Sequence, residues 1–322
     1  MKSRITRLIA LGATGLALAG WGGGAFANHI SLDLNNPDGN YYVYSTETSS
    51  SLLSGTGANR IYDVDSYDNY IYANIGSGRI ARWTVGLSGG TDPNLHPDNP
   101  DATGPMVART FSDRVVYSNT GIGHYSQSEI YATADALYFR NSSGPWGGLG
   151  GDLLKYDLAS GTTSVELTSA GSFLAYDDAT GTWYTGHENN RGVYSWNGSG
   201  WDLEFTYDNM AGSHMDGMEF VNGAMFVSDM TSDYILQATY NSGTGDWDKK
   251  NLFAYNDPTS TYVEGMGFGA FDHFWVGAGY NLIEIGGGKL QQEVTVAEPA
   301  SLMLMGLGLA GLGFATRRRR NG

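Results

Sequence analysis

A three-strand unit that recurs along the chain constrains the fold more than any other feature of the sequence. Residues 216–240, DGMEFVNGAMFVSDMTSDYILQATY, contain three short runs in which apolar and polar residues alternate, separated by Asn-Gly and Ser-Asp turns. This pattern is typical of half-buried antiparallel strands. Because one such unit cannot bury both of its faces, it has to pack against further copies of itself.

Four more copies can be aligned on the second strand of the unit. The five second strands are expected at residues 69–74, 136–141, 182–187, 224–229 and 273–278. The third strands are expected to begin at Arg79, Leu153, Gly192, Tyr234 and Asn281. The aromatic centres of the second strands follow one another at intervals of 66, 46, 42 and 49 residues. Periods of about 40 to 50 residues with about four strands per period predict the blades of an all-β propeller.

The number of blades depends on how the N-terminal part of the body is used. Residues 86–106, rich in Gly, Pro, Asn and Asp, are interpreted as a loop insertion that lengthens the first interval. Residues 41–46 and 50–55 look like two further strands. They either complete a sixth blade or close the ring against the last blade. Five units are identifiable, and the length of the body, residues 28–292, leads us to predict six blades.

Two of the units also resemble blades of a known kind of propeller. Residues 216–240 and 263–285 are similar to blades of the NHL and gluconolactonase types. The other three units share only the outline of the pattern. The resemblance implies a propeller fold and says less about chemistry, because one fold supports many functions.

The first 27 residues have the order of a secretory signal peptide. Basic residues at positions 2, 4 and 7 precede an apolar run from Leu8 to Ala19, and Ala25 and Ala27 form an A-x-A cleavage site. We therefore predict export and removal of residues 1–27. The sequence contains no cysteine, so the exported body depends on its core and not on disulfides.

The charge of the body limits its partners. Residues 28–292 contain 31 acidic and 11 basic residues, a formal net charge of −20. Such a surface repels nucleic acid and anionic lipid. We predict that the protein does not bind nucleic acid, whereas cations, basic partners and neutral polymers are compatible with this charge.

The last 30 residues, 293–322, combine three signals. Glu298, Pro299 and Ala300 precede an apolar segment at 302–315. Four basic residues follow that segment: Arg317, Arg318, Arg319 and Arg320. This order predicts a transmembrane helix with a cytoplasmic basic stop, which leaves the body on the opposite side of the membrane. The apolar run is short for a permanent span.

This tail resembles a PEP-CTERM sorting signal, with Ala297 in place of the first proline of the usual Pro-Glu-Pro. The resemblance implies a Gram-negative source, cleavage by exosortase after signal peptidase, and a stay at the inner membrane before arrival at the cell surface or outside the cell. It also implies a link to exopolysaccharide and biofilm. The alternative is an ordinary C-terminal membrane anchor.

Carboxylates are expected where the first strand of each blade begins, at the mouth of the propeller channel. The alignment places Asp63, Glu129, Asp216 and Glu264 there, with His214 close by. Carboxylates that face one another repel, and Ca²⁺ with oxygen ligands would relieve the repulsion. The gluconolactonase resemblance implies such a metal at Asp216 and Glu264. Alternatively, the acids accept hydrogen bonds from backbone amides.

The tryptophans also allow two interpretations. Most lie within the strand pattern, where aromatic rings fill the space between blades. Trp146 and Trp201 lie in turn-like sequence and are expected to be more exposed, where they could stack on sugar rings. We predict an exported binding or structural protein with no assigned catalytic residue. A metal-dependent hydrolase of the gluconolactonase kind and a scaffold without a small ligand are the alternatives.

Overall fold

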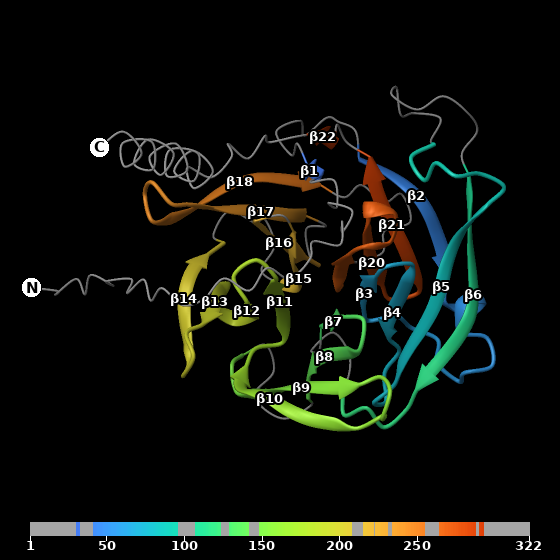
Figure 1. The fold of residues 1–322 in the computed structure, drawn as a ribbon, viewed down its shortest axis with the longest axis horizontal. Coiled ribbons are helices and arrows are strands. Elements are labelled where there is room, and N and C mark those ends of the chain that lie inside the picture. Colours follow the sequence, from blue (N-terminus) through green and yellow to red (C-terminus); the bar gives the residue numbers. More distant parts are fainter. Residues whose placement is uncertain are drawn as a thin grey trace, which may run out of the picture.

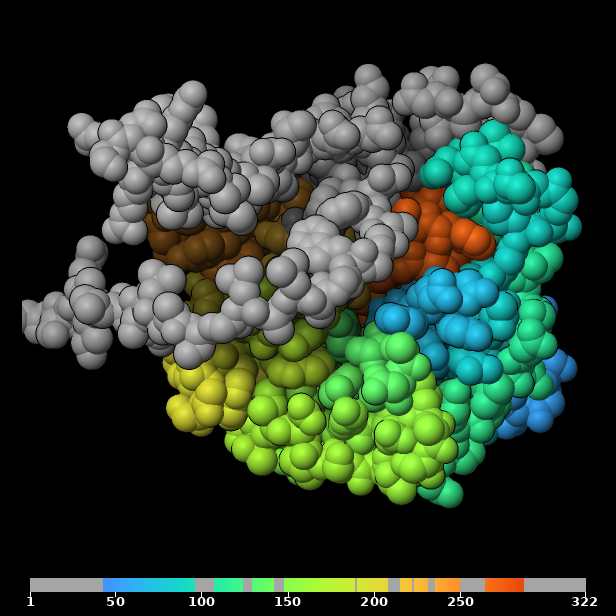
Figure 2. Space-filling model, in the orientation of Figure 1, coloured from blue at the N-terminus to red at the C-terminus, as the bar shows by residue number. Residues whose placement is uncertain are grey.

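A computed structural model describes residues 30–32, 41–95, 107–123, 129–141, 148–207, 215–221, 223–230, 234–254, 264–287 and 290–292. Within these residues, five four-stranded antiparallel sheets surround a common axis (Figure 1). The prediction of an all-β propeller is confirmed, and the prediction of six blades is wrong because there are five. In the space-filling view the blades follow one another around the molecule in chain order (Figure 2).

Four of the blades are built from consecutive strands. The first contains β3 (Asp63–Tyr67), β4 (Tyr70–Asn74), β5 (Ile80–Ser88) and β6 (Ala108–Tyr117). The second contains β7 (Ile130–Ala132), β8 (Ala136–Arg140), β9 (Gly151–Asp157) and β10 (Thr163–Ala170). The third contains β11 (Phe173–Asp177), β12 (Thr182–His187), β13 (Gly192–Trp196) and β14 (Trp201–Thr206). The fourth contains β15 (Met215–Val221), β16 (Ala224–Asp229), β17 (Tyr234–Asn241) and β18 (Asp246–Ala254).

The fifth blade combines both ends of the body and closes the ring. It contains β19 (Met266–Phe268), β20 (Phe274–Ala278) and β21 (Asn281–Gly287), with β2 (Tyr41–Thr48) as its outer strand. β2 pairs antiparallel with β21, from Tyr41 opposite Gly287 to Thr48 opposite Asn281. The N-terminal strand therefore completes the last blade and does not belong to a sixth, which is why the predicted count was one too high.

The second N-terminal segment is not a strand. Residues Ser49–Leu52 form the short helix α1, and the Thr48 side chain accepts a hydrogen bond from the Ser51 N–H at 3.4 Å. This cap ends β2 and turns the chain toward β3. The strand predicted at residues 50–55 is therefore wrong.

A separate two-stranded ribbon joins the ends of the body. β1 (Ile30–Leu32) pairs antiparallel with β22 (Leu290–Gln292). These strands lie just inside the boundaries predicted for the body at residues 28 and 292. The predicted signal helix and the predicted C-terminal hydrophobic helix lie outside the described residues.

The core lies between neighbouring blades and is formed largely by the second and third strands, as the repeat predicts. Trp83, Trp183, Trp247 and Trp275 are buried, so the core interpretation of these rings is confirmed. Trp201 is half-buried, and its Nε1 donates to the Thr168 carbonyl at 3.1 Å. Trp146 lies outside the described residues.

The propeller has two different ends, because the first strands of all five blades run in the same direction along the axis. They contact one another in the ring β3, β7, β11, β15, β19 and back to β3. At the end where they begin, here called the polar end, buried polar residues gather. At the other end, here called the aromatic end, each first strand carries a half-buried or exposed ring: Tyr67, Tyr131, Tyr176, Phe220 and Phe268.

Candidate functional site

The polar end brings together the carboxylates that the repeat alignment placed there. Asp63 is the first residue of β3, and Glu129 directly precedes β7. Asp216 is the second residue of β15, and Glu264 lies two residues before β19. All four side chains are buried. His214 lies outside the described residues.

Two of these carboxylates connect neighbouring blades through the backbone. Asp63 Oδ2 accepts a hydrogen bond from the Ile130 N–H of the second blade at 2.5 Å. The Glu129 carboxylate accepts the Leu174 N–H of the third blade and the Met218 N–H of the fourth. Because each acceptor belongs to one blade and each donor to another, these bonds hold the first strands together around the axis.

A second pair of carboxylates continues this arrangement toward the aromatic end. Asp65 Oδ2 accepts the Ala132 N–H at 2.5 Å, and Glu219 Oε2 accepts the Phe268 N–H at 3.2 Å. The sequence analysis missed Asp65 and Glu219 because it considered only the starts of the strands. The alternation Asp63-Val64-Asp65 was the available signal, since residues two apart in a strand share a face. We call Asp63, Asp65, Glu129 and Glu219 the axial carboxyl cluster.

Burial raises the pKa of every member of the axial carboxyl cluster, most directly because it removes water from the charged form. The backbone N–H donors oppose this effect, and the negative charges of neighbouring members add to it for Asp63, Glu129 and Glu219. Burial raises the pKa of Asp65 to about 7, although the backbone N–H donors and the Glu219 side chain act to lower it.

Two glycines of the fifth blade provide the space for this cluster. A Cβ on Gly265 would lie 1.4 Å from Asp63 Oδ1, and a Cβ on Gly267 would lie 2.1 Å from Asp65 Oδ1. The side-chain positions at Gly265, directly before β19, and at Gly267 within β19 are therefore filled by carboxyl groups of the first blade. The spacing of Gly265 and Gly267 matches the spacing of Asp63 and Asp65 because both strands repeat every two residues.

The described residues contain no group of three or more His, Asp or Glu side chains arranged to hold a metal ion. Glu264 Oε1 instead pairs with Arg60 Nη2 at 3.2 Å. The interactions of Asp63 and Glu129 correspond to the alternative in which the acids accept backbone hydrogen bonds, although the donors belong to neighbouring blades and not to local turns.

The polar end includes further polar residues that the sequence analysis did not select. They are the last residues of the second strands, namely Asn74, Arg140, His187 and Asp229. Arg140 is buried and its Nη1 donates to Ser172 Oγ at 3.1 Å, which connects the second and third blades. For Asn74, His187 and Asp229, the polar residue that ends the expected second strand was the signal.

The axial carboxyl cluster predicts that the protein becomes less stable as the pH rises. A carboxyl whose pKa is raised in the folded state binds more protons there than in the unfolded chain. Its stabilisation is complete below the unfolded pKa, about 4, and is lost as the pH rises through the folded pKa, which is about 7 for Asp65. We expect the free energy of unfolding to fall by about 2 kcal/mol or more between pH 5 and pH 9.

Urea unfolding at pH 5, 7 and 9 measures this slope. The Glu219→Gln variant is the control, because its amide oxygen can still accept the Phe268 N–H but carries no charge. The variant should flatten the pH dependence. A free energy of unfolding that increases from pH 5 to pH 9 would contradict the protonated state of the cluster.

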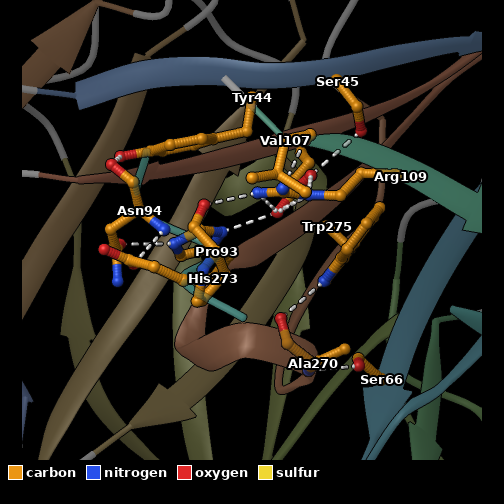
Figure 3. A network of polar contacts seen from close by, with 12 residues as sticks. Tyr44, Ser45, Ser66, Pro93, Asn94, Val107, Arg109, Ala270, His273 and Trp275 are labelled. Atoms are coloured by element: carbon orange, nitrogen blue, oxygen red, sulfur yellow. Dashed lines mark hydrogen bonds and ion pairs between the residues drawn. The ribbon is translucent and has the colours of Figure 1, made fainter. Parts of the chain in front are cut away.

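A second cluster of buried polar side chains lies where the ring closes (Figure 3). Arg109 of β6 donates from Nε to Glu284 Oε2 of β21 at 2.7 Å and from Nη2 to Glu284 Oε1 at 2.9 Å. His273 Nδ1 contacts Glu284 Oε1 at 2.7 Å. These side chains are almost completely inaccessible to solvent. We call Arg109, His273 and Glu284 the closure cluster.

The closure cluster also holds the N-terminal strand and part of the predicted loop insertion. Ser45 Oγ of β2 donates to Glu284 Oε2 at 3.0 Å, and the Tyr44 ring stacks on His273. Arg109 Nη2 donates to the Pro93 carbonyl at 2.6 Å. Burial alone would raise the pKa of Glu284, but hydrogen bonds from His273 and Arg109 hold it below its ordinary value. The cluster joins the first blade, the fifth blade and the closing strand.

The C-terminal residues match a known family. Residues 295–320 match the model of the PEP-CTERM protein-sorting motif. The chain carries a PEP-CTERM motif. The PEP-CTERM motif lies outside the described residues, and so do Glu298, Pro299, Ala300 and the arginines at 317–320. Among the residues that the structure describes, no helix is long and apolar enough to cross a membrane.

Several solved structures resemble the chain over most of its length. A luciferin-regenerating enzyme is 12% identical over 79% of this chain and 97% of its own, with a TM-score of 0.45. A glutaminyl cyclase from Myxococcus xanthus is 12% identical over 77% and 96%, with a TM-score of 0.44. A putative gluconolactonase is 13% identical over 80% and 97%, with a TM-score of 0.42. No curated protein sequence matches the chain.

Proposed function

We propose that the protein is an exported β-propeller with a binding or structural role at the cell surface or in the extracellular matrix of a Gram-negative bacterium. In this proposal signal peptidase removes residues 1–27, the tail at 293–322 passes through the inner membrane, and exosortase processes it at the PEP-CTERM motif. The motif match at residues 295–320 supports sorting for export. The link to biofilm belongs to the proposal.

The proposal of a binding or structural role rests on the hydrogen bonds that Asp63 and Glu129 of the axial carboxyl cluster accept. Asp63 and Glu129, which could have formed a catalytic or metal centre, accept backbone hydrogen bonds from neighbouring blades. Groups engaged in this way stabilise the ring, and breaking their bonds would leave buried N–H donors unpaired. Carboxylates in such a position favour a propeller that presents a surface over one that catalyses a reaction on its axis.

The rim of the polar end provides a surface of suitable chemistry. The Arg60 guanidinium lies over the Tyr62 ring at 5.2 Å and over the Tyr280 ring at 5.4 Å. Tyr280 is 59% exposed. Exposed aromatic rings beside hydrogen-bond donors suit sugar rings, and the net charge of −20 between residues 28 and 292 favours a neutral polymer over an acidic one. We therefore propose a neutral extracellular polysaccharide as the ligand.

Thermal unfolding of the mature protein with neutral and acidic polysaccharides tests this proposal. We expect a neutral polysaccharide to raise the thermal midpoint, because a ligand at a hundredfold excess over its Kd stabilises the folded state by about 2.7 kcal/mol. Tyr280→Ala should abolish the shift. Tyr240→Ala is the matched control, since Tyr240 is 52% exposed at the opposite end of the propeller. A shift that Tyr240→Ala removes and Tyr280→Ala does not would contradict the proposed surface.

Calcium is the second probe in the same measurement, because the alternative is a metal-dependent hydrolase. If the axial carboxylates are structural, Ca²⁺ should leave the thermal midpoint unchanged. A rise that disappears in Asp216→Asn and Glu264→Gln would favour the hydrolase and would justify a screen of lactone and ester substrates.

A further inference from the structure

Each blade ends, on the side away from the axis, in an outer strand whose far edge pairs with no other strand of the described residues. The five outer strands are β2, β6, β10, β14 and β18 (Figure 1). The N–H and C=O groups along the edge of a sheet are a template for pairing with another chain. The propeller therefore has five edges at which two copies of the protein could join.

Every outer strand carries a β-bulge, and the additional residue always belongs to the outer strand. In the second blade, Val165 of β10 lies opposite Leu154 of β9, and the next pair joins Leu167 to Leu153. Glu166 is therefore the additional residue. The other outer strands have one residue more than their partners at Tyr44 in β2, at Asp113 and Arg114 in β6, at Glu204 in β14 and at Asn251 in β18.

The pairs between first, second and third strands are regular by comparison. Nine of these ten pairs keep a single register through the described residues. The tenth shifts only between Met215 and Gly217, at the polar end. The bulges are therefore not a general feature of the sheets, because they gather where each sheet would otherwise end in a straight edge.

An additional residue disturbs the straight row of backbone groups that a further strand would need, because it bends the strand and increases its twist. Among the described residues, no run in one register on an outer strand exceeds five residues, as at 108–112 in β6 and 246–250 in β18. Charged side chains on an edge strand also oppose pairing. Each outer strand has at least one, including Glu47, Asp113, Glu166, Asp202 and Asp246.

The exposed strand β10 carries two such bulges. Six of its eight residues are exposed, and Val165 is 57% exposed. An exposed edge strand with β-branched and apolar residues is prone to aggregation. Glu166 interrupts β10 between Val165 and Leu167, and a second bulge lies between Leu167 and Ala170, where Ser169 has a positive φ of 61°. The strand is therefore unable to pair along its whole length.

We infer that the bulged outer edges prevent strand pairing, so that even concentrated copies of the protein stay separate propellers. The inference goes beyond the proposed function, because it does not depend on the polysaccharide or on the surface that binds it. It also separates two of the roles considered above. A scaffold of copies joined strand to strand is incompatible with such edges, whereas a propeller that binds its ligand as a single molecule agrees with them.

Removing the bulges of β10 tests this inference on the mature protein. Deletion of both Glu166 and Ser169 places residues 163–165, 167, 168 and 170 in one register opposite residues 151–156. We expect this variant to associate through its straightened edge, with at least about a twofold increase in sedimenting mass, because two identical edges can pair. Glu166→Gln is the matched control, since it removes the charge and keeps both bulges. It should sediment as a monomer at every concentration, like the unaltered protein.

Amide hydrogen exchange identifies the strand that pairs. Association of the deletion variant should slow exchange in residues 163–170 and leave exchange in the central strands unchanged. If that variant does not fold, deletion of Asn251 straightens β18 instead, with residues 246–250 and 252–254 in one register. A folded variant of either kind that stays monomeric would overturn the inference. The same conclusion follows if the unaltered protein associates with slower exchange in an outer strand.

Discussion

Replacing Gly265 by alanine is expected to prevent the five blades from packing into a closed ring. The added Cβ would lie 1.4 Å from Asp63 Oδ1 and 2.3 Å from Asp63 Cγ. These distances are far inside van der Waals contact, and Asp63 is held in place by the Ile130 N–H. Since the Asp63 carboxyl group is buried and held by this bond, the first and fifth blades have to separate. We expect a loss of more than about 4 kcal/mol in the free energy of unfolding, or failure to fold.

Two further variants make this prediction testable even if Gly265→Ala does not fold. Gly200→Ala is the matched control, because nothing lies within 4 Å of a Cβ at that position, and its effect should be within about 0.5 kcal/mol. Asp63→Gly combined with Gly265→Ala removes the clash and should recover part of the stability, with a coupling energy of about 1–3 kcal/mol. Additive effects of the two substitutions would show that Asp63 and Gly265 do not compete for the same space.

Removing Arg109 is expected to cost about 3–5 kcal/mol of stability, because the Glu284 carboxylate would be left buried without its main charged partner. Urea unfolding of Arg109→Met measures this loss. The control is Arg60→Met, which breaks the ion pair with Glu264. The Arg60 side chain is 37% exposed, whereas that of Arg109 is fully buried, so this change should cost less than the loss of Arg109.

The position of the closure cluster gives the same variant a second, local effect. Glu284 accepts hydrogen bonds from Arg109 of β6 and from Ser45 of β2. Loss of Arg109 should therefore loosen β2 more than the central strands, and amide hydrogen exchange in residues 41–48 should speed up. Unchanged exchange in β2 would mean that the cluster stabilises the fifth blade without helping to close the ring.

The sequence predicted those parts of the fold that depend on local patterns. All five second strands and all five third strands were located, because turn chemistry and alternating apolar residues are visible within a few positions. The blade count failed at residues 41–55, since a strand pattern does not reveal which sheet the strand joins. The starts of four of the five first strands were placed to within two residues, which brought Asp63 and Glu129 to the axis.

The interactions that hold the axis and the closure together were not predictable in the same way. Asp65 and Gly267 lie about 200 positions apart in the chain, and Arg109 and Glu284 are separated by 175. No local pattern pairs such residues. The functions of the buried acids also depended on their partners, because an Asp at a strand start is equally suited to a cation and to a backbone N–H.

The closing strand has a consequence for how the protein can be made. β2 is synthesised before every blade, yet its partner β21 follows about 240 residues later. Until the two meet, β21 has an open sheet edge, and open edges invite pairing with other chains. The ring therefore cannot close until the last blade has been synthesised. Protection of this edge from aggregation begins only when β2, the first strand of the ring in the chain, pairs with β21, the last.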